Sequence, residues 1–213
     1  MAIKAAFFDC DGTLTTAKSS WEYLHRRLNL WDDHADEFQR LFREGRIDYY
    51  EFCRRDAELW KGLRLGDVMK IIGEIPYHEG VREAMKVLHD ADIFTVILST
   101  GLSLLVEKVR RELGMTRAVA NELVVEDGVI TGEIRINVQY DNKGAWVEAI
   151  LAELGLGREE AAACGDGEGD RGMFEAVGFA IGYHPEPKVL PLLHSVLHDG
   201  SFARVADLVR AYR

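Results

Sequence analysis

The sequence predicts an α/β fold, namely a doubly wound and mostly parallel sheet with a small helical domain inserted after the first strand. Short apolar runs alternate with segments of helical spacing over most of the chain, and this alternation is typical of parallel sheets covered by helices. Residues 19–75 break the alternation, because they are rich in aromatic residues, Arg and Glu at helical spacing. We therefore expect an α/β core of residues 1–14 and 76–213 and a helical domain of residues 15–75.

The first strand and the helical segment are indicated by their apolar residues. Residues 3–8 form a mostly apolar run that stops at Asp9, as a buried parallel strand followed by a loop would. The helical segment has three apolar faces, which are formed by Trp21, Leu24 and Leu28, by Phe38, Leu41 and Phe42, and by Phe52 and Leu59. We expect Trp21, Trp31 and Trp60 to pack in the interior of this small bundle.

After Pro76 the pattern alternates between helices and strands. Turn sequences at 126–128 and 131–132 indicate a small antiparallel hairpin near 122–138. The other expected elements are a helix over 81–88, a strand over 93–98, a helix over 105–113, a helix over 146–154, a strand over 161–164, a last strand near 179–181 and a helix over 205–212. These elements complete the predicted core.

Composition and charge restrict the partners. The 213 residues include 26 Lys and Arg against 36 Asp and Glu, a net charge of −10, so we expect neither nucleic acid nor an anionic membrane surface as a partner. The first apolar run is too short for a signal peptide, and no stretch approaches the roughly 20 apolar residues of a membrane span. Three widely spaced cysteines indicate no disulfide framework. We expect a cytoplasmic protein, and the sequence indicates no particular oligomeric state.

Acidic side chains follow several of the predicted strands. Asp9 and Asp11 follow the first strand, Ser99 ends the second, and Asp166 and Asp170 follow a later one. Ligands of such sheets bind at the carboxyl ends of the strands, and crowded carboxylates are costly unless a cation lies among them. Because oxygen ligands favour a hard cation, we expect the four aspartates to surround Mg²⁺. The seven histidines show no ligand pattern and are expected on the surface or in loops.

The spacing of Asp9 and Asp11 suits two-step chemistry at one reacting group. Both leave the same strand end in a similar direction, so one carboxylate can attack as a nucleophile while the other donates and then withdraws a proton. The sequence therefore makes both residues candidates for catalysis.

The remaining candidates are groups that bind an anion. Ser99 and the backbone amides of Thr100 and Gly101, at an expected helix start, would hold an oxyanion. Lys143 precedes another expected helix, where it could neutralise the charge that develops near an attacking carboxylate. Together these groups indicate phosphoryl transfer, which depends mainly on positioning and charge neutralisation.

These motifs resemble those of the haloacid dehalogenase superfamily, and within it the phosphoserine-phosphatase-like branch with a helical C1 cap. Residues 8–15, Phe-Asp-Cys-Asp-Gly-Thr-Leu-Thr, match the first signature of the family, and Ser99-Thr100-Gly101 is similar to the second. Lys143 fits the third signature, and residues 165–170, Gly-Asp-Gly-Glu-Gly-Asp, fit the fourth. The resemblance implies a Rossmann-like core with the cap at 15–75.

The resemblance also implies roles for the candidate residues. Asp9 would form an aspartyl-phosphate, and Asp11 would act as general acid and then as general base. Mg²⁺ would be held by Asp9, by the backbone carbonyl of Asp11 and by Asp166, and Asp170 would support the metal or orient Lys143. The implied phosphate-binding residues are Ser99, Thr100, Gly101 and Lys143. A second aspartate at Asp11 favours a phosphatase over a dehalogenase, with a small phosphorylated metabolite as its substrate.

The sequence departs from this family pattern at three positions. Gly169 stands where the fourth signature has Asn, a residue that helps to hold the phosphate or the substrate. The Glu and Arg that phosphoserine phosphatases use for the amino and carboxylate groups of serine fall near Lys18 and Asp56, which carry the opposite charges. Phosphoserine is therefore one candidate substrate among small phosphomonoesters.

Two alternatives to a phosphatase are open at the level of sequence. Receiver-type signalling domains also combine an acceptor Asp, further acids, a Ser or Thr and a Lys, but without a cap. A protein that has kept the fold and binds phosphate without turnover is the second alternative, and Gly169 motivates it.

Overall fold

A computed structural model describes residues 2–212 and contains one seven-stranded sheet with the strand order β4-β3-β2-β1-β5-β6-β7. All neighbouring strands are parallel except β3 and β4, which form an antiparallel hairpin. The strands are β1 (Ala5–Phe8), β2 (Phe94–Leu102), β3 (Arg117–Glu126), β4 (Val129–Arg135), β5 (Ala161–Gly165), β6 (Phe179–Tyr183) and β7 (Ser195–Leu197). The predicted fold class, a mostly parallel doubly wound sheet, is confirmed.

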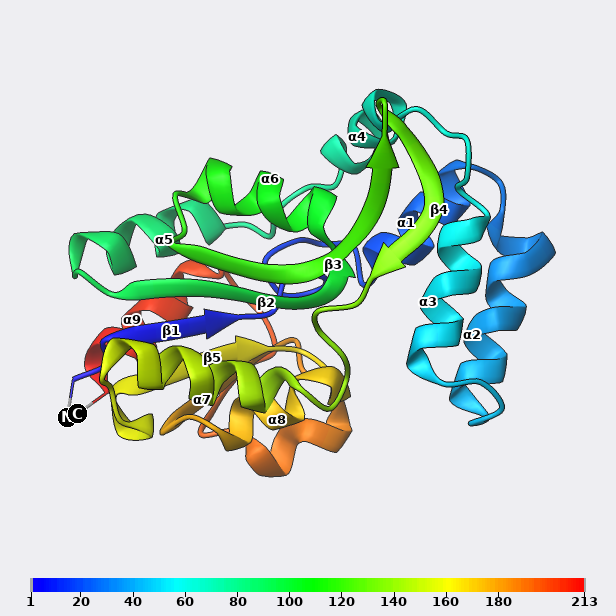
Figure 1. The fold of residues 1–213 in the computed structure, drawn as a ribbon. Coiled ribbons are helices and arrows are strands. Elements are labelled where there is room, and N and C mark those ends of the chain that lie inside the picture. The colour runs from blue at the N-terminus through cyan, green and yellow to red at the C-terminus, as the bar shows by residue number, and fades with distance from the viewer. Residues whose placement is uncertain (1, 213) are drawn as a thin grey trace.

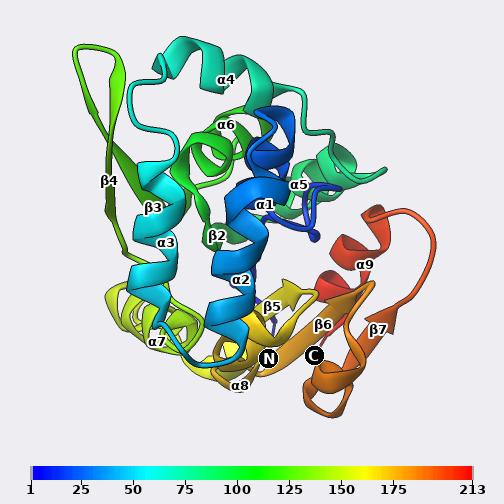
Figure 2. The ribbon, with the colours of Figure 1, turned by 90° about the vertical axis from the view of Figure 1, so that its right-hand side faces the viewer.

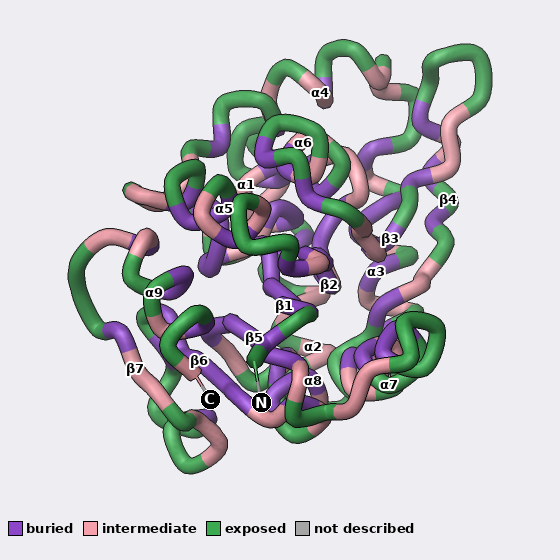
Figure 3. Tube along the Cα trace, turned by 90° about the vertical axis from the view of Figure 1, so that its left-hand side faces the viewer, coloured by how far each residue is buried: buried purple, intermediate pink, exposed green. Residues whose placement is uncertain are grey.

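Helices cover both faces of the sheet (Figure 1). One face carries α5 (Val81–Asp90), α6 (Ser103–Leu113) and α9 (Ala203–Ala211), and the other carries α7 (Lys143–Leu154) and α8 (Arg171–Glu175). Strand β1 is central, and its side chains alternate between the two layers: Ala6 and Phe8 pack on the first, Ala5 and Phe7 on the second. This burial on both faces explains why β1 has no polar residue (Figure 3).

The segment between β1 and α5 is helical. Its elements are α1 (Ser20–Arg27), the π-helical turn η1 (Trp31–Ala35), α2 (Asp36–Arg43), α3 (Tyr49–Glu58) and α4 (Leu65–Gly73). Helices α1, α2 and α3 lie beyond the carboxyl ends of β1 and β2 (Figures 1 and 2). Ser19 and Asp48 cap α1 and α3 by accepting hydrogen bonds from the backbone N–H groups of Glu22 and Glu51.

Backbone hydrogen bonds tie this helical segment to the β3–β4 hairpin. The N–H of Gly62 donates to the carbonyl of Ile130, the N–H of Ile130 donates to Leu63, and the N–H of Leu65 donates to Gly128. Helix α3 also packs against β4. The hairpin and the helical segment therefore form one continuous structure above the end of the sheet (Figure 2).

Several local features differ from the sequence expectations. Strand β2 continues to Leu102 instead of ending near 98, and β7 follows the strand that was expected to be the last. Trp21 and Trp60 are buried as expected, but Trp31 is half-buried. His25 contradicts the expectation for histidines, because it lies fully inside the helical segment. No helix among residues 2–212 combines the length and apolarity that a membrane crossing requires.

The burial of His25 has an identifiable partner. Its Nε2 lies 3.3 Å from Oδ1 of Asp56, which is also buried, and its ring packs 4.5 Å from that of Trp60. Burial raises the pKa of Asp56, while the contact with His25 opposes that rise. The contact is not a hydrogen bond: among the described residues, neither ring nitrogen of His25 nor Oδ1 of Asp56 has a hydrogen-bond partner.

The remaining short helical turns lie in the loops of the core. They are η2 (Arg158–Glu160), η3 (Glu168–Asp170) and η4 (Pro187–Leu192). Turn η3 lies three residues after the end of β5 and carries the predicted site residue Asp170, while Asp166 lies in the short connection between β5 and the turn. Because β2, β1 and β5 are adjacent parallel strands, the loops that follow them lie together at the carboxyl end of the sheet.

Candidate active site

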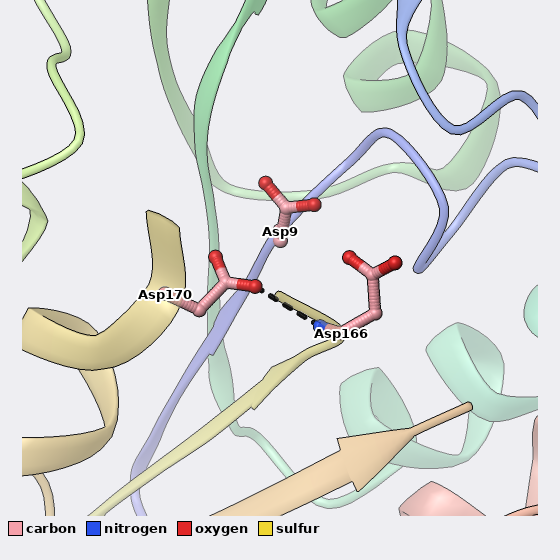
Figure 4. A group of neighbouring side chains, drawn as sticks. All are labelled: Asp9, Asp166 and Asp170. Atoms are coloured by element: carbon pink, nitrogen blue, oxygen red, sulfur yellow. Dashed lines mark hydrogen bonds between the residues drawn. The ribbon is translucent and has the colours of Figure 1, made fainter. Parts of the chain in front are cut away.

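Three aspartates from two loops converge beyond the carboxyl ends of β1 and β5. Asp9 directly follows β1, and its N–H donates to the carbonyl of Cys164 in β5 at 2.9 Å. Asp166 and Asp170 come from the loop after β5, and carboxylate oxygens of Asp9, Asp166 and Asp170 all lie within 4.8 Å of one another (Figure 4). The adjacent parallel pairing of β1 and β5 produces this convergence.

A buried lysine lies among these acids. Lys143 is the first residue of α7, and its Nζ lies 2.7 Å from Oδ1 of Asp9 and 2.7 Å from Oδ1 of Asp170. Burial lowers the pKa of the ammonium, but Asp170 and Asp9 more than offset this effect, so the pKa stays above its ordinary value. Lys143 is therefore a permanently charged group at the centre of the site.

Two carboxyl groups of the cluster, those of Asp9 and Asp166, are held in an environment that opposes their ionisation. Burial raises the pKa of Asp9, Lys143 lowers it, and the nearby Asp170 and Asp166 raise it further, with a net increase. Burial and the charge of Asp170 raise the pKa of Asp166 to about 6. Lys18 Nζ, which is largely exposed, approaches Oδ2 of Asp166 at 2.5 Å and partly offsets this rise.

The loop after β5 is fixed by Asp170. Oδ2 of Asp170 accepts hydrogen bonds from the N–H groups of Asp166 and Gly167 at 3.0 and 3.1 Å. A side chain at Gly165 would collide with the same carboxylate. One oxygen of Asp170 therefore holds the backbone of this loop, and the other contacts Lys143. Asp166 faces the exposed Lys18 instead.

Asp11 is held separately, at the first turn of α1. Its Oδ2 accepts hydrogen bonds from the N–H of Ser20 at 2.9 Å and from the hydroxyl of Ser20 at 2.7 Å. Among residues 2–212, its buried Oδ1 has no hydrogen-bond partner. Burial raises the pKa of Asp11, whereas Ser20 and Lys143 oppose the rise. The side chain of Asp11 lies outside the three-aspartate cluster, although all four aspartates were expected around one metal.

Ser99, Thr100 and Gly101 lie near the end of β2. The hydroxyl oxygen of Ser99 accepts a hydrogen bond from the N–H of Gly101 at 3.0 Å, and Ser99 is buried. The expected helix start at this motif is wrong: the strand continues to Leu102, and α6 begins at Ser103. The backbone amides of Thr100 and Gly101 therefore belong to a strand end, which keeps them close to the Ser99 hydroxyl.

Gly101 is required by close packing, not by its backbone angles. A Cβ at this position would lie 2.5 Å from Oδ2 of Asp11, 2.8 Å from the Ser20 hydroxyl and 3.0 Å from the Ser99 hydroxyl. We expect Gly101→Ala to displace these groups and to reduce kcat/KM at least a hundredfold, since misplacing a reacting group by 1 Å can cost about 10² in rate. Steady-state kinetics would measure this loss.

Gly66 offers a matched control for that substitution. It lies in α4, and a Cβ there meets no atom within 4 Å. Gly66→Ala should leave the kinetics unchanged and raise helix stability slightly. Equal kinetics for the two variants would contradict the role given to the packing around Gly101.

The donor set fits a divalent cation with oxygen ligands. The cluster offers three carboxylates from Asp9, Asp166 and Asp170, and all the donors are oxygens, as Mg²⁺ prefers. The raised pKa of Asp166 arises partly from carboxylate repulsion, which a cation would relieve. Lys18 already supplies a positive charge at the exposed side of the same carboxylate.

Sequence reasoning missed the residues that connect the site to the helical segment. The carbonyl of Thr100 accepts hydrogen bonds from Trp21 Nε1, from the Tyr49 hydroxyl and from Asn121 Nδ2, at 3.1, 3.1 and 3.0 Å. Asn121 is buried, and its Oδ1 accepts the N–H of Val138. Asn121 stands beside Glu122 in a strand that also begins and ends with charged residues, so the sequence does not single it out as a buried polar group.

The fold and the acidic, lysine-containing site are those of a hydrolase that transfers a group to a carboxylate at the end of a central strand. A family model described as haloacid dehalogenase-like hydrolase matches residues 6–175. The chain belongs to this family, in its phosphoserine-phosphatase-like branch, and it is an enzyme of the phosphatase class.

Individual relatives agree with this assignment. The phosphoserine phosphatase of Methanocaldococcus jannaschii is 30% identical over 185 residues, which cover 86% of this chain and 87% of the relative. The phosphoserine phosphatase of Wolinella succinogenes is 27% identical over 87% of this chain and 89% of its own. A solved phospho-aspartyl intermediate analogue of phosphoserine phosphatase has a TM-score of 0.84 at 26% identity and covers 98% of this chain and 99% of its own.

Proposed function

We propose that this chain is a Mg²⁺-dependent phosphatase that hydrolyses a small phosphomonoester through an aspartyl-phosphate on Asp9. The observation that carries the proposal is the position of Asp9, whose carboxylate lies beside Lys143 and within the three-aspartate cluster. Asp166, Asp170, Asp9 and the backbone carbonyl of Asp11 would hold the metal. When bound, Mg²⁺ would neutralise the charge of the phosphoryl group and of the surrounding carboxylates.

In the first step, an oxygen of Asp9 forms a bond to phosphorus while the bond from phosphorus to the ester oxygen breaks. Asp11 gives its proton to the leaving alcohol, a role that its raised pKa supports. Ser99, the amides of Thr100 and Gly101, and Lys143 bind the phosphoryl oxygens. In the second step, Asp11 takes a proton from water, the water oxygen attacks phosphorus, and phosphate leaves Asp9.

We propose that residues 15–75 act as a cap over a core of residues 1–14 and 76–213. The contacts of Trp21 and Tyr49 with the Thr100 carbonyl support this division, since they bring the helical segment directly onto the phosphate-binding strand end. A cap in this position excludes water and contacts the leaving group. The three buried free cysteines support a reducing location, the cytoplasm.

Metal removal gives a direct test of the proposed function. We expect phosphate release from 4-nitrophenyl phosphate in Mg²⁺ and a fall of at least a hundredfold in excess EDTA, with recovery when Mg²⁺ is added back. Thermal unfolding with and without EDTA shows whether the protein stays folded. Activity that is unaffected by EDTA would contradict the metal-dependent mechanism.

The lifetime of the phosphorylated protein separates the phosphatase from a phospho-acceptor domain. Acid quenching after mixing with substrate, followed by intact mass measurement, should show an aspartyl-phosphate that decays at the rate of turnover. A phosphorylated state lasting minutes would favour signalling instead. Metal binding without turnover of any ester would favour the non-catalytic alternative that Gly169 suggests.

A further inference from the structure

Tyr140 packs against Gly169, which precedes Asp170 in the loop after β5. A Cβ on Gly169 would lie 3.3 Å from Cδ1 and 3.4 Å from Cε1 of Tyr140. Gly169 is not among the glycines with positive φ, so its backbone angles do not require glycine. The Tyr140 ring therefore fills the space that a side chain at position 169 would use.

Tyr140 also joins an aromatic cluster that spans the core and the helical segment. We define this cluster as Phe42, Tyr49, Phe52 and Tyr140. The Tyr140 ring lies 5.5 Å from Tyr49, edge-on, and 5.7 Å from Phe42, which stacks on Phe52 at 5.2 Å. Tyr140 is half-exposed, whereas Tyr49 is buried, so Tyr140 is the member of this pair that a ligand can reach more readily.

The aromatic cluster borders the phosphate-binding groups on two sides. Tyr49 donates its hydroxyl hydrogen to the carbonyl of Thr100, next to Ser99. Tyr140 lies three residues before Lys143 in the sequence, and it contacts Gly169, which precedes Asp170. Burial raises the pKa of the Tyr140 phenol, and the positive charges of Lys143 and Arg43 oppose that rise.

The two positions that the family resemblance assigns to the ammonium and carboxylate groups of phosphoserine carry the opposite charges, and both charges are paired. Lys18 contacts Asp166, and Asp56 is buried against His25 in the interior of the helical segment. Lys18 stands where a negative charge would bind the ammonium group of an amino acid, and Asp56 stands where a positive charge would bind its carboxylate.

The other charges close to these positions are paired as well. Glu22 pairs with Arg26, and both Arg54 and Arg55 pair with Glu51, along single helices. The aromatic cluster favours a planar leaving group, because aromatic rings gain from packing on one another.

We infer that Tyr140 is a specificity-determining residue and that it selects phosphate esters whose alcohol carries an aromatic ring. This inference rests on the proposed phosphatase function, since it concerns the leaving group of the same reaction. It accounts for Gly169, which leaves room for the Tyr140 ring to approach the loop after β5.

The test compares primary-alcohol esters of similar intrinsic reactivity: 2-phenylethyl phosphate, O-phosphoserine and phosphoethanolamine. We expect the wild type to favour 2-phenylethyl phosphate over O-phosphoserine by at least tenfold in kcat/KM. Tyr140→Ala should lower that ratio about tenfold, mainly through KM, and Tyr140→Phe should keep it. Tyr50 is similarly exposed but lies outside the aromatic cluster, so Tyr50→Ala should change nothing.

Gly169→Asn probes the same contact from the other side. In the wild type the new side chain must displace the Tyr140 ring, so the preference for 2-phenylethyl phosphate should fall. Combined with Tyr140→Ala, the same substitution should cause little further change, which gives a non-additive double-mutant cycle. This second route keeps the inference testable if Tyr140→Ala does not fold.

The outcomes separate the two proposals. Equal kcat/KM for the aromatic and zwitterionic esters, or a ratio that Tyr140→Ala leaves unaltered, would overturn the inference about Tyr140 while the phosphatase function stands. Loss of the preference in Tyr140→Phe would overturn selection by the ring. No phosphate release from any ester, including 4-nitrophenyl phosphate, would overturn the proposed function and this inference with it.

Discussion

Replacing Asp9 with Asn is expected to reduce phosphatase turnover at least a thousandfold. The amide is nearly the same size as the carboxylate, but it is a far weaker nucleophile, so no aspartyl-phosphate forms. Initial rates with 4-nitrophenyl phosphate in saturating Mg²⁺ would measure the loss, and intact mass after acid quenching should show no phosphorylated protein. Retention of more than a few per cent of the wild-type rate would exclude Asp9 as the nucleophile.

The stability of Asp9→Asn distinguishes a chemical defect from a folding defect. Because burial and the neighbouring acids raise the folded-state pKa of Asp9, ionising this group near neutral pH opposes folding. The favourable contribution of a group with a raised pKa is present at low pH and is lost as the pH rises. Asn resembles the protonated carboxyl group, so in EDTA at neutral pH the variant should be at least as stable as the wild type.

The sequence was informative where function depends on strand ends. Asp9, Ser99 and Asp166 follow or end apolar runs, and parallel strands bring such positions to one edge. Their convergence could therefore be predicted from order and spacing alone. The position of Lys143 before a helix suggested that it neutralises charge near an attacking carboxylate, but its contact with Asp170 was implied only by the family resemblance.

Other features depend on tertiary neighbours that a single sequence does not show. Strand β7 has three residues, too few for an alternating pattern. His25 is buried beside Asp56, which lies 31 positions later in the sequence. Gly169 lies against the Tyr140 ring, a contact that the sequence around Gly169 does not show. Such pairings are decided by packing between elements, whereas propensity and periodicity describe one element at a time.

Replacing Lys143 with Met is expected to damage both activity and stability. The ammonium group is buried and lies between two carboxylates at 2.7 Å, and removing one partner of a buried ionic contact costs about 3–5 kcal/mol. Urea unfolding in EDTA would measure this loss as a lower free energy of unfolding. We also expect kcat to fall at least a hundredfold, because a charge that would bind the phosphoryl group is gone.

Two further variants show whether the lost stability comes from the buried charge of Lys143. Lys86 is exposed and pairs with Asp90 on the surface of α5, so Lys86→Met should cause no measurable change. Adding Asp9→Asn to Lys143→Met removes one of the carboxylates left without a counter-charge, so the double variant should regain part of the lost stability. If Lys143→Met unfolds like Lys86→Met, or if Asp9→Asn restores nothing, then the buried lysine does not stabilise the acidic cluster by charge.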